Sequence, residues 1–219
     1  MYLISILTYL FFLFGSAYAQ IKLSPEEALQ KLKDGNQHFV EKKMECVIDF
    51  LEELKNSKKK QTPFAAILCC SDSRVPPEII FNESLRKLFV VRVAGNVATD
   101  VTIGSLEYAI LQLKVPLVIV LGHDQCRVLE AAVKKEKSLP PFIEELIQDT
   151  SSAVEEAEKE SKNFAKELHI AIVKNVQFQI QEIIEKSVTL SEAKEKHQIL
   201  LQGAVFHFKN GRVEWCPCL

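Results

Sequence analysis

Side chains that can bind a metal or move a proton follow three apolar runs of the sequence. The first run leads into "CSDSR", the second into "RVAGN" and the third into "GHDQC". Cys70, His123 and Cys126 in these segments offer two thiolates and an imidazole. This ligand set matches the borderline softness of Zn²⁺. Three protein ligands leave a fourth position for water, which is the arrangement of a catalytic rather than a structural zinc site.

Asp72 and Arg74 stand close to the first of these cysteines. Asp72 is placed either to ligate the metal or to accept a hydrogen bond from a water molecule on it. Arg74 is expected to hold Asp72 in a bidentate ion pair and to lower the pKa of its carboxyl group. Cys69 precedes Cys70 in an extended strand, so its side chain is expected to point to the opposite face, outside the site.

The elements that carry these groups decide whether they meet. The three apolar runs cover 64–70, 88–94 and 115–122, and their hydrophobic residues are continuous, as is typical of strands covered on both faces. Helical segments such as 102–114 separate the runs, which predicts right-handed βαβ units and a parallel sheet. Ligands bind at the carboxyl ends of such strands, so the three groups are expected to meet at one edge. If a helix begins at Gly122, His123 and Cys126 also share one of its faces.

The flanking regions complete an α/β fold of one domain. "SPEE" supplies an N-cap, a proline at the first helical position and a capping box, which predicts a helix over 25–42 with Gly35 as its weak point. A long helical region is expected over 141–187, in one or two pieces. The segment "ILLQGAVFHFKNGRVEW" predicts a hairpin. The expected architecture is a central, mostly parallel sheet flanked by helices, with an N-terminal helical arm and a C-terminal β-hairpin edge.

Length and charge exclude some classes of protein. The chain has 219 residues, enough to bury a core in one domain without staples. Its net charge is −2, and the charge-dense segment 155–169 alternates in sign. Both features argue against a nucleic-acid partner.

The first residues read as a secretory signal peptide. The apolar stretch "YLISILTYLFFLF" has 13 residues, too few to span a bilayer as a helix. It is followed by "GSAYAQ", in which Ala17 and Ala19 occupy the small-residue positions of a cleavage site. We expect cleavage after Ala19, which leaves residues 20–219 as one zinc-binding domain that is periplasmic or secreted and keeps no membrane anchor. An uncleaved anchor is the alternative, since no Lys or Arg precedes the stretch.

All six cysteines lie in residues 20–219, at 46, 69, 70, 126, 216 and 218. An oxidising compartment favours disulfides, so a thiol that stays reduced there needs a reason such as a metal. The pairing of Cys46, Cys69, Cys216 and Cys218 is not decided by the sequence.

Taken together, "CSDSR", "RVAGN" and "GH..C" strongly resemble the β-class carbonic anhydrases. The resemblance extends from "LSPEEALQKLKDGNQHFV" through "SRVPPEIIF" to "GAVFHFKNGRVEW". It implies that Cys70, His123 and Cys126 bind one Zn²⁺ per subunit and that Asp72 and Arg74 form a catalytic dyad. It also implies reversible hydration of carbon dioxide to bicarbonate by zinc-bound hydroxide, with Asp72 as a fourth ligand in a closed form of the site. The family assembles as a homodimer or a larger homo-oligomer, with the N-terminal helix draped over a partner.

Two residues depart from the family pattern. Arg127 stands where the family usually has glycine, and Asp124 where it often has serine. Arg127 either narrows the access to the site, pairs with Asp72 or points to solvent. Asp124 and Arg127 are also candidates for a compensating ion pair.

Two other functions stay open at this stage. One is a related zinc hydrolase that acts on carbonyl sulfide or carbon disulfide. The other is a non-catalytic protein, which binds zinc or bicarbonate or uses Cys69 and Cys70 in thiol redox chemistry. Of the histidines outside the ligand set (38, 169, 197 and 207), the sequence identifies none as a proton shuttle.

Overall fold

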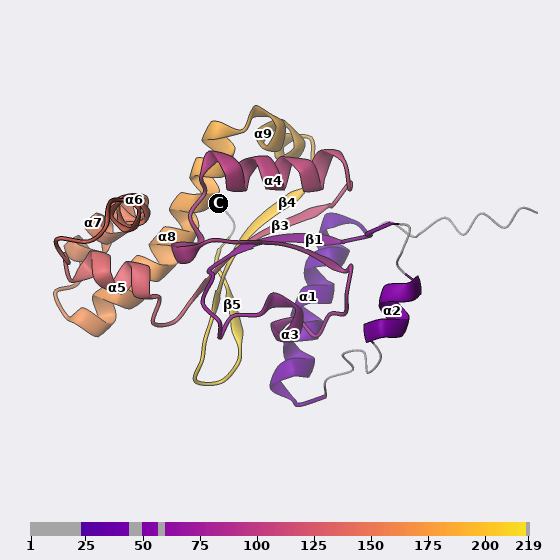
Figure 1. Cartoon of the computed structure of the whole chain (residues 1–219), viewed down its shortest axis with the longest axis horizontal. Coiled ribbons are helices and arrows are strands. Elements are labelled where there is room, and N and C mark those ends of the chain that lie inside the picture. Colours follow the sequence, from indigo (N-terminus) through magenta and orange to yellow (C-terminus); the bar gives the residue numbers. More distant parts are fainter. Residues whose placement is uncertain (1–22, 44–49, 57–59, 218–219) are drawn as a thin grey trace, which may run out of the picture.

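A computed structural model describes residues 23–43, 50–56 and 60–217. These residues form a 5-stranded sheet in the order β2-β1-β3-β4-β5 (Figure 1). The strands β1 to β4 are parallel, and β5 is antiparallel to β4. The prediction of a mostly parallel α/β sheet with a hairpin at its edge is therefore confirmed. The strands are β1 (Ala65–Cys69), β2 (Leu88–Arg92), β3 (Leu117–His123), β4 (Leu200–Phe206) and β5 (Val213–Trp215).

The register aligns the carboxyl ends of the strands at one edge. Cys69 lies beside Arg92 of β2 and beside Leu121 of β3, while His123 lies beside Phe206 of β4. The connections after β1 and β2 cross opposite faces of the sheet, so the chain reverses its winding between β1 and β3. Such a switch point opens a crevice outside the strand ends, where α/β proteins bind their ligands.

Helices cover both faces of the sheet (Figure 1). On one face, α1 (Pro25–Val40) and α3 (Pro77–Ile80) bury Leu32 and Ile80 against β1 and β3. On the other face lie α4 (Asp100–Leu111), α8 (Phe164–Lys186) and α9 (Val188–Glu195). Burial on both faces explains why the strands read as continuous apolar runs.

The first helix begins as predicted and packs against its own chain. The Ser24 hydroxyl accepts from the Glu27 N–H at 3.1 Å, and the Glu27 carboxylate accepts from the Ser24 N–H at 2.7 Å. The helix is continuous through Gly35, where packing requires glycine. A Cβ there would lie 1.9 Å from the Phe81 carbonyl oxygen, so only glycine permits this close approach of α1 to the end of α3. The helix ends at Val40 instead of residue 42. Its expected contact with a partner subunit stays a prediction.

The helical region after residue 141 is divided more than the sequence suggested. It forms α6 (Pro141–Gln148), α7 (Ser151–Glu160) and α8, which is three helices rather than two. The other helical elements are α2 (Phe50–Asn56), the 3₁₀ turn η1 (Ala94–Asn96) and α5 (Arg127–Val133). In the described part of the chain, no helix combines the length and the apolar character needed to cross a membrane.

Two glycines bring α8 close to the sheet. A Cβ on Gly122 of β3 would lie 2.8 Å from a methyl group of Val176, and a Cβ on Gly203 of β4 would lie 2.6 Å from the other. Both distances are shorter than atoms tolerate, so α8 can rest on β3 and β4 only because these positions lack side chains.

Candidate metal centre

Cys70, His123 and Cys126 meet at the carboxyl edge of the sheet. Their ligand atoms all lie within 4.8 Å of one another, and all three residues are buried. Cys70 directly follows β1, His123 is the last residue of β3, and Cys126 is the N-cap of α5. No helix begins at Gly122: His123 ends a strand, and a turn with Gln125 at a φ of 55° brings Cys126 back beside it.

The His123 ring is oriented as a metal ligand. Its Nδ1 lies 2.8 Å from the Asp124 carbonyl oxygen, which can only accept, so the proton is on Nδ1. The lone pair is then on Nε2. This atom is buried and has no hydrogen-bond partner among the described residues. A buried imidazole nitrogen without a partner is costly unless it binds a metal, so the ring fits a Zn²⁺ ligand.

The two cysteine thiols lie close enough to affect each other's ionisation. Contact with Cys126 lowers the pKa of the Cys70 thiol, while contact with Cys70 and burial raise the pKa of the Cys126 thiol. The Gly95 N–H also points to the Cys70 sulfur, at 3.4 Å. A lowered pKa favours the thiolate form of Cys70, which suits a thiolate-binding cation. Together with His123, this donor set fits zinc.

A buried polar network from α8 holds the Gly95 donor in place. Gly95 has a φ of 75°, a conformation that favours glycine, and its carbonyl accepts from the Asn175 amide at 3.0 Å. Gln179 in turn donates to Asn175 at 3.0 Å and accepts from the Ala98 N–H at 2.7 Å. Asn175 and Gln179 were not among the predicted site residues, because they lie in the middle of a helix without a recognisable motif.

Cys69 lies outside the site, as predicted. It is buried in the hydrophobic cluster under α1, whereas Cys70 belongs to the cluster under α4 and α8. Burial raises the pKa of the Cys69 thiol to about 12. Because the two thiols face opposite layers, the arrangement does not favour redox chemistry between them. Of the remaining cysteines, Cys216 is buried and unpaired, and the predictions for Cys46 and Cys218 lie outside the described residues.

Asp72 and Arg74 form the expected bidentate pair beside the three ligands. Arg74 Nε donates to Asp72 Oδ1 at 2.9 Å and Arg74 Nη2 to Oδ2 at 2.7 Å, and the Arg74 backbone N–H adds a third bond at 2.9 Å. These bonds lower the pKa of Asp72 to about 2. Arg92 donates to the Asp72 carbonyl oxygen at 2.6 Å and fixes the backbone between Cys70 and Arg74. The Asp72 carboxylate faces Arg74, and its ligation in a closed form stays a prediction.

Phe208 links the dyad to the ligand set. The Arg74 guanidinium carbon lies 4.3 Å from the centre of the Phe208 ring, a cation–π contact. The centre of the same ring lies 5.4 Å from that of the His123 ring. No sequence motif pointed to this residue, because it lies in the hairpin, far from all three motifs.

The residues that depart from the family pattern do not pair with each other. Arg127 forms an ion pair with Glu130 at 2.7 Å, and its side chain is 70% exposed, so it points to solvent. Asp124 instead contacts His207, at 3.0 Å. The idea of a compensating Asp124–Arg127 pair is therefore wrong, and nothing in the position of Arg127 suggests a narrowed access.

A largely apolar pocket of about 600 Å³ adjoins the dyad. Its apolar lining residues are Phe39, Val40, Phe206 and Phe208, and the remaining ones are Lys42, Arg74, Asn210 and Gly211.

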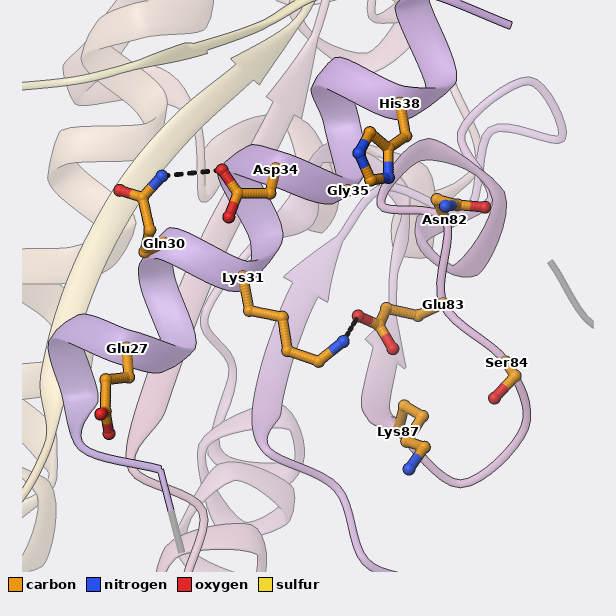
Figure 2. A pocket seen from close by; sticks show the side chains of 10 residues that line it. All are labelled: Glu27, Gln30, Lys31, Asp34, Gly35, His38, Asn82, Glu83, Ser84 and Lys87. Carbon is orange, nitrogen blue, oxygen red and sulfur yellow. Dashed lines mark hydrogen bonds and ion pairs between the residues drawn. The ribbon is translucent and has the colours of Figure 1, made fainter. Parts of the chain in front are cut away.

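A second pocket, of about 540 Å³, lies between α1 and the segment that leads into β2 (Figure 2). Charges of both signs line it, and Lys31 pairs there with Glu83. Segment 82–87 precedes β2, so this pocket lies toward the amino ends of the strands, away from the metal ligands. Its groups join α1 to the rest of the chain and take no part in the candidate site.

Comparison with known proteins identifies the family. A family model described as carbonic anhydrase matches residues 65–213, more than half of the 219 residues. The chain belongs to the β-class carbonic anhydrases. The carbonic anhydrase of Mycolicibacterium smegmatis is 31% identical over 194 residues, which cover 87% of this chain and 93% of the relative. Carbonic anhydrase 2 of Mycobacterium tuberculosis is 30% identical over 86% of this chain and 91% of its own.

Solved structures of this class share the fold. The β-carbonic anhydrase CafA of Aspergillus fumigatus superposes with a TM-score of 0.68 at 23% identity, over 87% of this chain and 89% of its own. One of two tetrameric β-carbonic anhydrases from Sordaria macrospora gives a TM-score of 0.66 at 24% identity, over 75% of this chain and 86% of its own. The reaction of the family is the zinc-dependent, reversible hydration of carbon dioxide to bicarbonate and a proton. This carbonic anhydrase chain carries the Cys–His–Cys donor set that such zinc chemistry requires.

Proposed function

We propose that this carbonic anhydrase hydrates carbon dioxide at the site formed by Cys70, His123 and Cys126, with Asp72 and Arg74 as the catalytic dyad. The observation that carries the assignment is the buried Cys–His–Cys set, in which His123 Nε2 has no other partner in the described structure. Zinc held by these three residues supplies a Lewis acid that lowers the pKa of a coordinated water to near 7.

Asp72 has the role of orienting the attacking water. Its carboxyl group stays ionised at neutral pH because Arg74 lowers its pKa to about 2. An ionised carboxylate can only accept hydrogen bonds, so it fixes the direction of the water proton and hence of the oxygen lone pair. Arg74 keeps the carboxylate in one orientation through its two side-chain bonds. The apolar pocket beside Arg74 suits carbon dioxide, which is uncharged and linear.

The first test is stopped-flow measurement of carbon dioxide hydration by the zinc-loaded protein from pH 6.5 to 9. A rate well above the uncatalysed one, rising with pH, is the expected result. Asp72→Asn should retain one zinc per chain and lose activity by about 10²–10³-fold, because it removes the oriented acceptor. Equal turnover in Asp72→Asn would refute the role of Asp72. An inactive wild-type protein with zinc bound would refute the proposed reaction, and carbonyl sulfide and carbon disulfide would then be tested as substrates.

We also propose that the chain is exported. The support is the apolar stretch before "GSAYAQ", with small residues at Ala17 and Ala19. Mass spectrometry of the protein from fractionated cells should find a mature amino terminus at Gln20 in the periplasmic or secreted fraction. An intact amino terminus in the membrane fraction would favour an uncleaved anchor instead.

A homodimer or a larger homo-oligomer is the proposed assembly. The support is the likeness to the Sordaria macrospora enzymes, which are tetrameric β-carbonic anhydrases of the same fold. Light scattering coupled to size exclusion should give a mass that is an even multiple of the chain. A monomer mass across micromolar concentrations would contradict the proposal.

A further inference from the structure

His207 lies between two carboxylates at the end of β4. Its Nδ1 is 3.0 Å from Asp124 Oδ1 and 3.2 Å from Asp124 Oδ2, and its Nε2 is 3.0 Å from Glu214 Oε2. The side chains of His207 and Asp124 are 19% and 26% exposed, so their contact is largely shielded from water. The His169 ring stacks on His207 from α8, with 6.4 Å between the ring centres.

Asp124 connects this cluster to the metal ligand His123. Its backbone carbonyl oxygen accepts from His123 Nδ1 at 2.8 Å. Its carboxylate accepts from His207 and also from the Phe208 backbone N–H, at 3.2 Å. The same residue therefore holds the imidazole with its main chain and is itself held by its side chain.

The sheet alone does not fix the Asp124 carbonyl. The ladder between β3 and β4 ends with His123 beside Phe206, and one further bond joins the Asp124 N–H to the Phe206 carbonyl oxygen at 3.0 Å. Beyond this point the chain turns toward Cys126, with Gln125 in a left-handed conformation. The carboxylate contacts with His207 and Phe208 are the bonds that restrain the peptide after Asp124.

We infer that His207 is a positioning residue for the metal site: through Asp124 it sets the orientation of the His123 ring. The inference rests on the proposed zinc site. His207 Nδ1 donates to the Asp124 carboxylate, the Asp124 carbonyl accepts from His123 Nδ1, and His123 Nε2 is thereby aimed at the position shared with Cys70 and Cys126. Partners of ligating histidines typically account for 10–100-fold of metal affinity. His207 contacts Asp124 and not His123 itself, so we expect its effect on zinc affinity to be at the lower end of that range.

The test compares zinc affinity and ligand geometry in matched variants of the full chain. Zinc dissociation constants come from competition with a chromogenic chelator, and geometry comes from the visible bands of the Co²⁺-substituted protein. His207→Phe keeps a ring but removes the Nδ1 donor. It should weaken zinc binding by about 10-fold and shift the Co²⁺ bands. His207→Asn places an amide donor near the position of Nδ1 and should restore most of both.

Two controls separate positioning from general damage. Glu214→Gln alters only the outer contact of His207 and should stay within about 2-fold of wild type in zinc affinity. Asp124→Ala should weaken zinc at least as much as His207→Phe does, because it also removes the acceptor of the Phe208 N–H. The double variant should lose no more than Asp124→Ala alone, because both changes break the same link.

Unaltered zinc affinity and Co²⁺ bands in His207→Phe would overturn the inference, as would additive losses in the double variant. If His207→Phe does not fold, Asp124→Ala and His207→Asn give the same comparison. Failure of the wild-type protein to bind one zinc per chain, with Cys126→Ser behaving identically, would instead refute the zinc site itself.

Discussion

The two halves of the site are built in different ways. The ligand half is buried, with Cys70, His123 and Cys126 exposed by 6%, 0% and 1%. The dyad half faces solvent, with Asp72 and Arg74 side chains exposed by 15% and 49%. The positions of the ligands depend on the packing of β1, β3 and α5. The dyad instead is held by hydrogen bonds between Asp72 and Arg74, which are two residues apart in the sequence. We therefore expect substitutions deep in the core to disturb the metal ligands. The dyad should be disturbed only by substitutions of residues that contact it.

Cys70 and Cys69 offer the sharpest contrast between being in the site and being next to it. Cys70→Ser removes a thiolate ligand and should lower zinc content far below one per chain and activity to the uncatalysed rate. Cys69→Ala should keep zinc and turnover and lose only about 1 kcal/mol of stability. Metal analysis and stopped-flow assays distinguish the two. Similar losses in both variants would mean that the opposite orientation of the two thiols is wrong.

Arg74→Ala tests how local the dyad is. Turnover should fall by about 10²-fold because the Asp72 carboxylate is no longer held in place, while zinc content stays at one per chain. The pKa of Asp72 is about 2 in the wild type, against an ordinary value of 3.8. The ion pair between Asp72 and Arg74 thus stabilises the folded protein fully above pH 3.8, and this stabilisation is lost as the pH falls toward 2. The carboxyl ¹³C shift should titrate near 2 in the wild type and closer to 3.8 in the variant. An unmoved midpoint would contradict the causal role of Arg74.

Asn175→Leu tests the dependence of the ligand half on the core. The change removes the donor to the Gly95 carbonyl and one of the two acceptors of the Gln179 amide, the other being the Asp149 carbonyl oxygen. Stability of the zinc-loaded protein should fall by about 1–3 kcal/mol in urea denaturation. Gln181→Leu, an exposed position on the same helix, is the matched control and should change stability by no more than about 0.5 kcal/mol. Equal effects at the two positions would argue against the network.

Phe208→Leu tests the contact between the two halves. It keeps an apolar side chain but removes the ring that lies under Arg74 and beside His123. A cation–π contact of about 0.5–1 kcal/mol corresponds to a loss of about 2- to 5-fold in kcat. Phe208→Tyr retains the ring and should retain the rate. A larger loss in the tyrosine variant than in the leucine variant would exclude the proposed ring contact.

Arg127→Gly should have the smallest effect. The Arg127 side chain pairs with Glu130 and points away from the dyad, so kcat/KM for carbon dioxide should stay within about 2-fold of wild type, since an exposed ion pair contributes little. A clear rise in rate would mean that this side chain obstructs the site after all.

Much of this site could be predicted because it depends on short-range rules. The alternation of side chains along a strand separates Cys69 from Cys70, and parallel strands bring their carboxyl ends together. A spacing of two residues was enough to predict the Asp72–Arg74 pair. The same rules predicted the parallel sheet and the hairpin.

The supporting residues could not be predicted because their partners are distant in sequence. Asp124 and His207 are 83 residues apart, and Gly95 and Asn175 are 80 apart. Only the register of β3 with β4, or the position of α8 on the sheet, brings each pair together. Without that register, the nearby Arg127 was the expected partner for Asp124. The packing role of Gly35 could not be predicted for the same reason, since the Phe81 carbonyl that requires glycine there lies outside α1.

The close approach of α8 to the sheet also limits how this sequence can diverge. Gly122 and Gly203 have no reactive group, yet a methyl group on either would displace Val176, which follows Asn175 in α8. If either glycine is replaced while Val176 is present, α8 has to shift, and the Asn175 amide that holds Gly95 against Cys70 shifts with it. A smaller residue at position 176 therefore has to come first. Two positions without chemistry of their own thus restrict the order in which mutations can accumulate around the metal.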